Sequence, residues 1–160
     1  MKIGFYPGSF DPFTNGHLRV VKRSSLLFDK VVIGIGLNED KKVRYNHEEM
    51  KEAIKRVLER EGLTNVEVVT YNNLTVDAAR DNGADLIIRG IRNGMDYDYE
   101  ENLALINEEI SGLDTIYIRA GNLGYISSSF VVQLLQNGRD ISSYVPQEIY
   151  ELIKDRPVGM

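Results

Sequence analysis

Ten residues near the N-terminus, Gly8 to His17, combine the residue types that bind phosphate groups. They follow a short apolar segment, residues 2–6, and lead into residues 18–28, whose apolar side chains recur with helical spacing. A strand, a turn rich in Gly and Pro, and a helix start form an anion site, because the first backbone N–H groups of a helix lack partners within it. A histidine there can direct a hydrogen-bond donor or a positive charge at a phosphoryl oxygen. This segment predicts an enzyme that handles nucleotides.

The composition narrows the class of protein. The chain has 160 residues, enough for one domain with a buried core, and a formal net charge of −5, which argues against a general nucleic-acid binder. It contains no cysteine, so disulfides and thiolate zinc sites are excluded and a cytoplasmic setting is favoured. No segment has the pattern of a signal peptide or a membrane span. We therefore expect one soluble domain over residues 1–160, with a frayed tail at 154–160 and neither nucleic acid nor membrane as a partner.

Strands and helices alternate along the chain. Short β-branched runs predict five strands, at residues 2–6, 30–35, 65–69, 85–88 and 114–118. This order is typical of an α/β fold, a Rossmann-like open parallel five-stranded sheet with helices on both faces. Such sheets bind ligands beyond the carboxyl ends of their strands, so the residues after each strand should carry the chemistry.

Two of the intervening helices have clear signals. Asn46 and Glu49 have the spacing of a capping box for a helix that begins near His47, and Gly62 is placed to end it. A second helix is expected over residues 96–110. Its apolar side chains Tyr99, Leu103, Ile106 and Ile110 fall on one stripe. The two tyrosines near its start, Tyr97 and Tyr99, are expected to pack.

Cations, glycine turns and hydroxyl groups follow four of the five strands. The second strand is followed by Lys41, Lys42 and Arg44, the fourth by Arg89 and Arg92, and the fifth by residues 119–129, which end in three serines. A charge run is often only a solvated loop, and a serine cluster often only caps a helix. Arg89 and Arg92 directly follow the apolar strand 85–88, and this position favours a functional role for them. Together, the residues at the strand ends suit a ligand with several phosphates.

With these residues in place, the chain resembles the phosphopantetheine adenylyltransferases over nearly its whole length. Residues 8–17 match the nucleotidyltransferase pattern G-[ST]-F-D-P-x-[TH]-x-G-H, with Thr14 at a position often held by histidine. That pattern identifies the superfamily only. The stretches 88–92, 96–100 and 126–129 indicate the narrower family.

The resemblance implies the reaction of ATP with 4′-phosphopantetheine, which gives dephospho-coenzyme A and pyrophosphate in coenzyme A biosynthesis. It implies Mg²⁺ as cofactor, with no protein metal ligands assigned, and a homohexamer. Ser9 is expected to contact both substrates, and the pantetheine substrate is expected to contact Lys41, Thr75 and Arg89. The expected ATP contacts are Phe10, His17, Gly90, Ile91, Arg92, Glu100, Leu123, Gly124, Tyr125, Ile126, Ser127, Ser128 and Ser129.

The residue types favour a mechanism without a general base, because the attacking phosphate is already mostly a dianion at neutral pH. We expect an in-line displacement at the α-phosphorus in which His17 donates to an α-phosphate oxygen and Lys41 orients the nucleophile. Arg92 and the serines at 127–129 are expected to hold the β- and γ-phosphates.

Two departures from the family pattern concern Leu123, where an aromatic residue is usual, and Met50, where an arginine is usual.

Two other functions remain open from the sequence. One is a nucleotidyltransferase that uses nicotinate mononucleotide, or CTP with a small alcohol phosphate. The other is a nucleotide-binding regulatory module without turnover, although Lys41 and Arg89 on the acceptor side speak against it.

Overall fold

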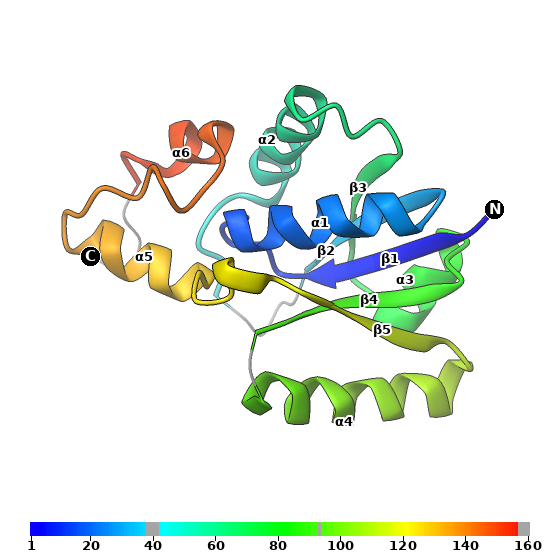
Figure 1. Cartoon of the computed structure of the whole chain (residues 1–160). Coiled ribbons are helices and arrows are strands. Elements are labelled where there is room, and N and C mark those ends of the chain that lie inside the picture. The colour runs from blue at the N-terminus through cyan, green and yellow to red at the C-terminus, as the bar shows by residue number, and fades with distance from the viewer. Residues whose placement is uncertain (38–41, 93, 157–160) are drawn as a thin grey trace.

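The computed structural model describes residues 1–37, 42–92 and 94–156 and contains one five-stranded parallel sheet (Figure 1). The strand order is β3-β2-β1-β4-β5. The strands are β1 (Ile3–Gly8), β2 (Lys30–Gly36), β3 (Val66–Tyr71), β4 (Leu86–Ile91) and β5 (Asp114–Arg119). The predicted α/β class and parallel sheet are confirmed. Three strands, β1, β3 and β4, extend beyond their predicted carboxyl ends by two or three residues and the other two by one, so Pro7, Gly8 and Arg89 belong to strands and not to the loops that follow.

Helices cover both faces of the sheet, as predicted. The helices are α1 (Asn15–Leu27), α2 (His47–Arg60), α3 (Thr75–Asp81), α4 (Gly94–Ser111), α5 (Ser128–Gln136) and α6 (Gln147–Ile153), with a short 3₁₀ helix η1 (Gly121–Leu123). Figure 1 shows α1 and α2 on one side of the sheet and α4 on the other. The alternation of β2 explains this, because Val31 and Ile33 pack in the cluster under α1 and α2, whereas Val32 packs with Val76 of α3.

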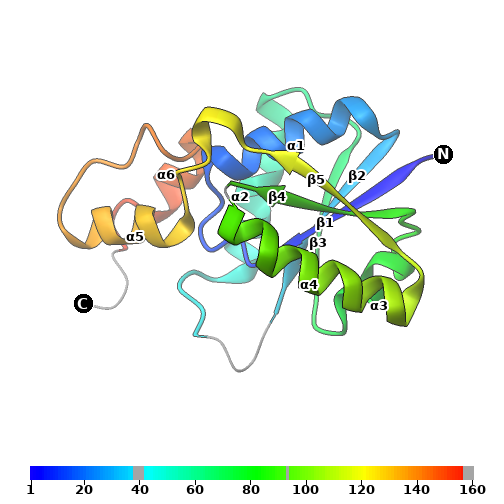
Figure 2. The ribbon, with the colours of Figure 1, turned by 60° about the horizontal axis from the view of Figure 1, so that its bottom comes forward.

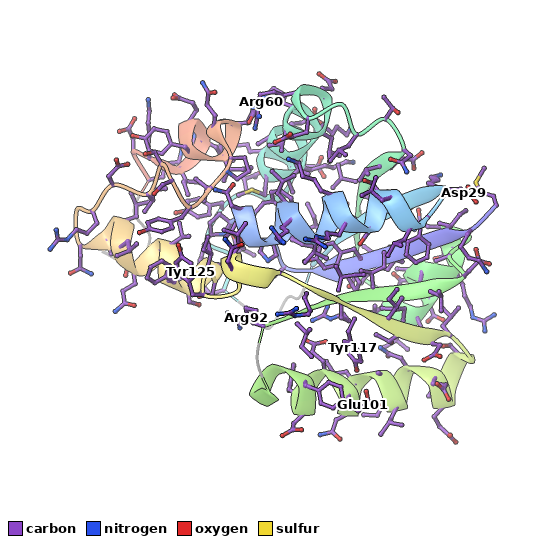
Figure 3. The ribbon with its side chains drawn as sticks, viewed as in Figure 1. Asp29, Arg60, Arg92, Glu101, Tyr117 and Tyr125 are labelled. Atoms are coloured by element: carbon purple, nitrogen blue, oxygen red, sulfur yellow. The ribbon has the colours of Figure 1, made fainter. Side chains whose placement is uncertain are left out.

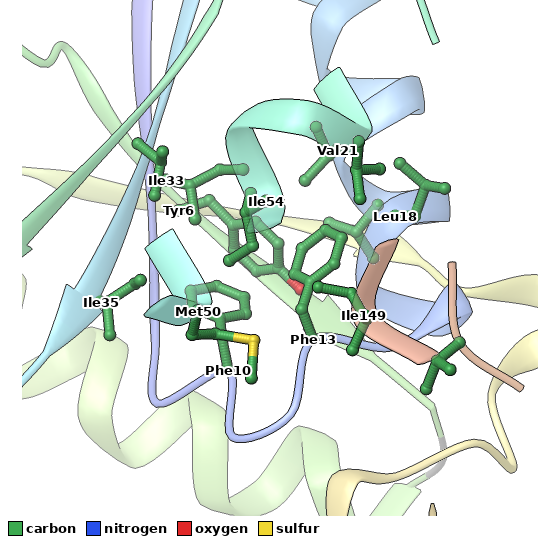
Figure 4. Close-up of a cluster of buried hydrophobic side chains, with 14 of the residues drawn as sticks. Tyr6, Phe10, Phe13, Leu18, Val21, Ile33, Ile35, Met50, Ile54 and Ile149 are labelled. Carbon is green, nitrogen blue, oxygen red and sulfur yellow. The ribbon is translucent and has the colours of Figure 1, made fainter. Parts of the chain in front are cut away.

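The loop between β1 and α1 is fastened into the main core by two phenylalanines. Phe10 is 2% exposed and Phe13 is fully buried. Figure 4 shows both rings beside Met50 of α2 and Ile149 of α6, which belong to the same buried cluster. Burial of a phenylalanine side chain contributes about 1.5–3 kcal/mol. Packing of Phe10 and Phe13 in the core therefore holds the predicted phosphate-binding loop in place.

The ends of α2 follow the sequence signals with one difference. The Asn46 side chain accepts a hydrogen bond of 3.0 Å from the backbone N–H of Glu49, and Gly62 has a φ of +69°, which suits a residue just after a helix. The Glu49 carboxylate, however, forms an ion pair of 2.6 Å with Arg156, and it is exposed. Only the Asn46 half of the predicted capping box is described, and Glu49 instead anchors the segment after α6.

The apolar stripe of α4 faces outward. Of its two tyrosines, Tyr97 packs against Tyr117 of β5 with 5.5 Å between ring centroids, as expected, whereas Tyr99 is 64% exposed. Tyr99, Leu103, Ile106 and Ile110 are all exposed, the last two by 57% and 56%. The residues that face the sheet are polar or small and include Glu100, which is 8% exposed. Figure 2 shows α4 in front of β4 and β5, with no other described element over its outer side. The stripe therefore forms a surface and not part of the core.

The C-terminal segment is anchored as far as Arg156. The backbone N–H of Arg156 donates to the carbonyl of Ile153 at 2.9 Å, and the Arg156 guanidinium contacts Glu49. The rest of the predicted frayed tail, residues 157–160, lies outside the described residues. Within the described parts of the chain, none of the helices combines the length and apolar character that a membrane crossing requires.

Candidate active site

Two cavities open at the carboxyl ends of the strands and share one wall. Their volumes are about 690 Å³ and 250 Å³, and we call them the larger and the smaller cavity. The residues that line both are Pro7, Gly8, Ser9, Arg89 and Glu100. The wall thus lies between β1 and β4, where the order of the strands reverses and where parallel α/β sheets bind their ligands.

The two cavities differ in the elements that line them. The smaller cavity is bounded by the start of α1, the end of β4 and the start of α5, which contribute Gly16, His17, Gly90, Arg92, Ser127 and Ser128. The larger cavity is bounded by the segments after β2 and β3 and by the inner face of α4, and its polar residues include Lys42, His47, Asn72, Asn73, Thr75 and Asn107. Helix starts, hydroxyls and cations around the smaller cavity suit a phosphorylated ligand.

His17 takes part in the cap of α1. Thr14 precedes the helix, and its hydroxyl accepts a hydrogen bond of 3.3 Å from the backbone N–H of His17. In return, the backbone N–H of Thr14 donates to Nδ1 of His17 at 3.0 Å. A backbone N–H can only donate, so Nδ1 must be an acceptor and the proton of the neutral ring resides on Nε2. The capping interaction therefore selects the tautomer that offers an Nε2–H donor.

Two aromatic rings enclose His17. The Phe10 ring lies edge-on at 4.9 Å between centroids, and the Phe13 ring is stacked at 5.6 Å. Burial among these rings, together with the positive charges of Arg92 and Arg89, lowers the pKa of His17 from 6.5 to about 3. The imidazole is accordingly neutral across the physiological range and can donate without carrying a charge.

Arg89 and Glu100 form a paired wall between the cavities. Nε and Nη2 of Arg89 lie 2.6 and 2.8 Å from the two carboxylate oxygens of Glu100, and Nη1 donates to the Pro7 carbonyl at 2.7 Å. Burial disfavours the guanidinium charge, but the hydrogen bonds and charge of Glu100 outweigh it and raise the pKa of Arg89. A phosphate that binds Arg89 must share the cation with Glu100.

Comparison with known proteins bears on what these cavities serve. Residues 5–143 match the family model for cytidylyltransferase-like proteins. The chain is 43% identical over 146 residues to the phosphopantetheine adenylyltransferase of Porphyromonas gingivalis, covering 91% of this chain and 94% of that one. Relatives of the same name from Flavobacterium psychrophilum and Clostridium perfringens are 40% and 37% identical, and the matches cover 93% and 100% of this chain and 98% of each relative. The chain belongs to the phosphopantetheine adenylyltransferase family.

Solved structures show the same fold at lower identity. A putative nicotinate-nucleotide adenylyltransferase from Vibrio parahaemolyticus superposes with a TM-score of 0.71 at 19% identity, covering 97% of this chain and 93% of that one. A nicotinic acid mononucleotide adenylyltransferase from Plasmodium falciparum gives 0.69 at 15%, covering 98% and 96%. At these identities the likeness concerns the fold alone, so it does not favour a nicotinate substrate over the one in the family name.

The residues predicted from the likeness to phosphopantetheine adenylyltransferases gather at these cavities, with some exceptions. Ser9, Arg89 and Glu100 line the shared wall, and Thr75 lines the larger cavity. The predicted residues that line the smaller cavity are Phe10, His17, Gly90, Arg92, Ile126, Ser127 and Ser128. Neither lining includes Ile91, Leu123, Gly124, Tyr125 or Ser129. Lys41 lies outside the described residues.

The exceptions on the β5–α5 connection have other contacts. Tyr125 is 60% exposed and its ring meets Phe130 at 6.0 Å and Tyr144 at 6.4 Å. Figure 3 shows Tyr125 beside η1, with Arg92 at the end of β4 below it. The Ser129 hydroxyl accepts a hydrogen bond of 3.1 Å from Arg44. These residues therefore belong to the predicted segment without lining either cavity.

Sequence reasoning missed several polar residues of the larger cavity. Asn107 and Thr115 line it from α4 and β5, and the buried Thr115 hydroxyl has no hydrogen-bond partner in the described structure. A signal was present, because Glu100, Ala104 and Asn107 have the spacing of one helical face between apolar residues. Beside the cavity, Tyr117 of β5 donates to Glu101 of α4 at 2.7 Å, and Figure 3 shows the two side chains facing each other.

Proposed function

We propose that the protein transfers the adenylyl group of ATP to 4′-phosphopantetheine, giving dephospho-coenzyme A and pyrophosphate. The observation that carries this proposal is the shared wall between the two cavities, which lets two ligands meet at Ser9, Arg89 and Glu100. Membership of the phosphopantetheine adenylyltransferase family supports the choice of substrates. A nucleotide-binding module without turnover would not need the second cavity.

ATP is assigned to the smaller cavity and phosphopantetheine to the larger one. The start of α5 supports the first assignment, because the N-cap and first residue of this nine-residue helix, Ser127 and Ser128, line that cavity, and backbone N–H groups at a helix start favour phosphate oxygens. The size of the larger cavity and its mixed lining support the second. An extended pantetheine arm carries amides that hydrogen-bond to side chains such as Asn72, Asn73 and Asn107.

The reaction needs no general base. An oxygen of the phosphopantetheine phosphate, mostly dianionic at neutral pH, forms the new bond to the α-phosphorus of ATP. The bond from that phosphorus to the oxygen bridging to the β-phosphorus breaks, and pyrophosphate leaves with that oxygen. His17 donates from Nε2 to an α-phosphate oxygen as charge builds there. Its pKa of about 3 supports a donor role over proton shuttling.

Cations on both sides hold the phosphates in line. Arg92 and the hydroxyl of Ser127 line the smaller cavity and are assigned to the β- and γ-phosphates, and Ser128, whose hydroxyl donates to Pro12, is assigned to them through its backbone N–H at the helix start. Arg89 and Lys42 line the larger cavity, and Lys41, its neighbour in sequence, keeps its predicted role of orienting the nucleophile. Alignment of this kind, together with charge stabilisation, accounts for most of the catalysis in phosphoryl transfer.

Mg²⁺ is proposed to arrive with ATP. Among the side chains that the structure describes, in residues 1–37, 42–92 and 97–156, no cluster of three His, Asp or Glu could hold a metal ion, and the Glu100 carboxylate is already paired with Arg89. This donor set does not fit a protein-bound Mg²⁺ cage, whereas phosphate oxygens and water are ligands that Mg²⁺ commonly keeps. Bound to the nucleotide, such an ion would offset the charge of the pyrophosphate leaving group.

A homohexamer in the cytoplasm completes the proposal. The outward apolar stripe of α4 supports self-association, because a surface stripe that includes Tyr99, Ile106 and Ile110 gains stability when a second copy covers it; Leu103, at the edge of the stripe, lines the larger cavity. The absence of cysteine from the sequence supports a reducing compartment.

A pyrophosphate-release assay tests the activity. The purified protein is given ATP or CTP with each of three acceptors: 4′-phosphopantetheine, nicotinate mononucleotide and glycerol 3-phosphate. We expect release only with ATP and phosphopantetheine, and dephospho-coenzyme A as the second product by mass spectrometry. Release with nicotinate mononucleotide instead, or nucleotide binding without release for every acceptor, contradicts the proposal.

A further inference from the structure

Arg44 joins three segments that are far apart in the sequence. Its Nη1 donates to the carbonyl of Asp11 at 2.9 Å, and its Nη2 donates to the hydroxyl of Ser129 at 3.1 Å. Asp11 lies in the loop between β1 and α1, and Ser129 lies in the first turn of α5. Arg44 itself lies in the segment that leads from β2 into α2. One guanidinium therefore connects the β1–α1 loop, the segment before α2 and the start of α5.

We call this contact of Arg44 with Asp11 and Ser129 the joint, and the carboxylate of Asp11 strengthens it. Oδ2 accepts the backbone N–H of Arg44 at 2.7 Å, and Oδ1 accepts the backbone N–H of Tyr45 at 2.9 Å. Hydrogen bonds to an ionised carboxylate are about twice as strong as neutral ones. The Tyr45 side chain, 4% exposed, packs in the main core and fixes the chain just after the joint.

The joint stands between the two cavities. Lys42 and Val43, directly before Arg44, line the larger cavity, as does Asp11. Ser127 and Ser128, directly before Ser129, line the smaller one. The smaller-cavity wall has a separate attachment, because the Ser128 hydroxyl donates to the Pro12 carbonyl at 2.7 Å. Loss of the Arg44 side chain would therefore loosen the segment at 42–44, which would keep only its backbone bonds to Asp11, and would leave the start of α5 tied to the β1–α1 loop.

We propose that Arg44 is a positioning residue that holds the acceptor side of the site in register with the nucleotide side, through Asp11 and Ser129. The inference rests on the proposed function, since it concerns how the two substrates of that reaction are aligned. Arg44 lines neither cavity, so it acts through the residues beside it and not by contact with substrate. The proposal implies that phosphopantetheine binding depends on Arg44 and that ATP binding does not.

Four variants test the proposal. Arg44→Met keeps the length of the side chain and removes both guanidinium bonds, and Arg44→Lys keeps the charge but offers a single nitrogen in place of the planar fork. Ser129→Ala removes only the bond to α5. Arg23→Met, at an exposed position of α1, is the matched control for loss of one positive charge. Each is measured for kcat, for the KM of each substrate and for thermal stability.

Arg44→Met is expected to raise the KM for phosphopantetheine roughly 5–10-fold, the equivalent of about one hydrogen bond, with the KM for ATP within about twofold of wild type. Ser129→Ala is expected to raise the same KM by a smaller factor, because its bond to Arg44 is exposed. Adding Ser129→Ala to Arg44→Met is expected to change nothing further, since the partner is already gone. Arg44→Lys should recover only part of the loss.

Binding measured apart from turnover distinguishes alignment from general damage. Calorimetry with phosphopantetheine, in the presence and absence of a non-hydrolysable ATP analogue, is expected to show that the analogue tightens acceptor binding less in Arg44→Met than in wild type. Equal increases in both KM values, a rise in the ATP KM with Ser129→Ala, or a phenotype of Arg44→Met no different from Arg23→Met each overturns the proposal. An inactive wild-type protein would instead contradict the proposed function.

Discussion

The backbone N–H of Thr14 donates to Nδ1 of His17 at 3.0 Å, and this bond places the proton of the neutral imidazole on Nε2. A hydrogen bond of helix capping thus prepares the donor that the proposed reaction uses. Thr14 occupies a position where the superfamily pattern allows either threonine or histidine, and in this chain its buried side chain completes the cap. This relationship, the Arg89–Glu100 pair and the outward stripe of α4 lead to five predictions.

The tautomer of His17 can be observed directly. The chain has only two histidines, so long-range ¹H–¹⁵N spectra of protein labelled at histidine contain two imidazole patterns. The His17→Gln spectrum assigns them. We expect His17 to show a protonated Nε2 and an unprotonated Nδ1 throughout pH 5–8, because its pKa is about 3. A cationic ring at pH 5, or a protonated Nδ1, contradicts the capping geometry.

The depressed pKa also predicts how stability varies with pH. Unfolded, His17 titrates near 6.5 and binds a proton as the pH falls, whereas the folded protein binds it only near pH 3. The unfolded state therefore holds more protons between these values, and His17 makes folding less stable on acidification by up to about 1.4 kcal/mol per pH unit. Urea denaturation at pH 7 and 5 measures this. His17→Gln should lose this contribution and His47→Gln should keep it; equal slopes in both variants would argue against it.

Removal of the His17 ring should affect turnover more than binding. His17→Ala is expected to lower kcat by roughly 10²–10³-fold, the loss typical of one preorganised donor, with little change in the KM for ATP. Steady-state kinetics test this, and thermal melts show whether the fold is retained. A variant with wild-type kcat and only a raised KM would assign His17 to ground-state binding instead.

Variants of the Arg89–Glu100 pair are expected to change the stability of the fold and the activity in different ways. Glu100→Gln or Arg89→Met leaves a largely buried charge without its partner and is expected to cost about 3 kcal/mol of unfolding free energy. The double variant Arg89→Met/Glu100→Leu should recover most of that stability, because no charge remains unpaired. Its activity should stay low, with a raised KM for phosphopantetheine. Denaturation curves and kinetics of the three proteins distinguish this outcome from a purely structural pair, for which activity would return with stability.

The outward face of α4 should control assembly. Ile106→Glu and Ile110→Glu place charges on the exposed apolar stripe and are expected to dissociate the proposed hexamer, as seen by light scattering after size-exclusion chromatography. Glu109→Lys, an exposed change on the same helix outside the stripe, serves as the control. A wild-type protein that is monomeric at micromolar concentration contradicts the proposed assembly.

The strands could be predicted from the sequence, but their ends could not. Nearly continuous β-branched runs such as 31–35 are typical of a parallel strand buried on both faces, and that signal is strong. At their carboxyl ends, however, β1 contains Pro7 and Gly8, residue types that normally indicate a turn, and β4 contains the charged Arg89. The register continues through them, with Arg89 opposite Tyr117. Pairing with neighbouring strands overrides local preference, and this cannot be read from one segment alone.

The candidate site could be located from the sequence, but the contacts within it could not. His17, Arg89 and Ser127 were identified by residue type at strand and helix ends. The partners that define their chemistry are set by tertiary structure: Glu100 reaches Arg89 from another element, and Asp11 meets Arg44 from 33 residues away. Similarly, the periodicity of α4 indicates an apolar face but does not distinguish a core from a surface that a second copy covers.

The wall common to both cavities is formed partly by the last two residues of β1, a strand hydrogen-bonded on both sides within the sheet. Two molecules bound against it would have their separation set by a central strand and not by a mobile loop. The protein would then convert an encounter between two dissolved phosphates into a reaction at high effective molarity, with the entropy of alignment already lost when the chain folds. On this view the stiffness of the sheet is itself part of the catalytic apparatus.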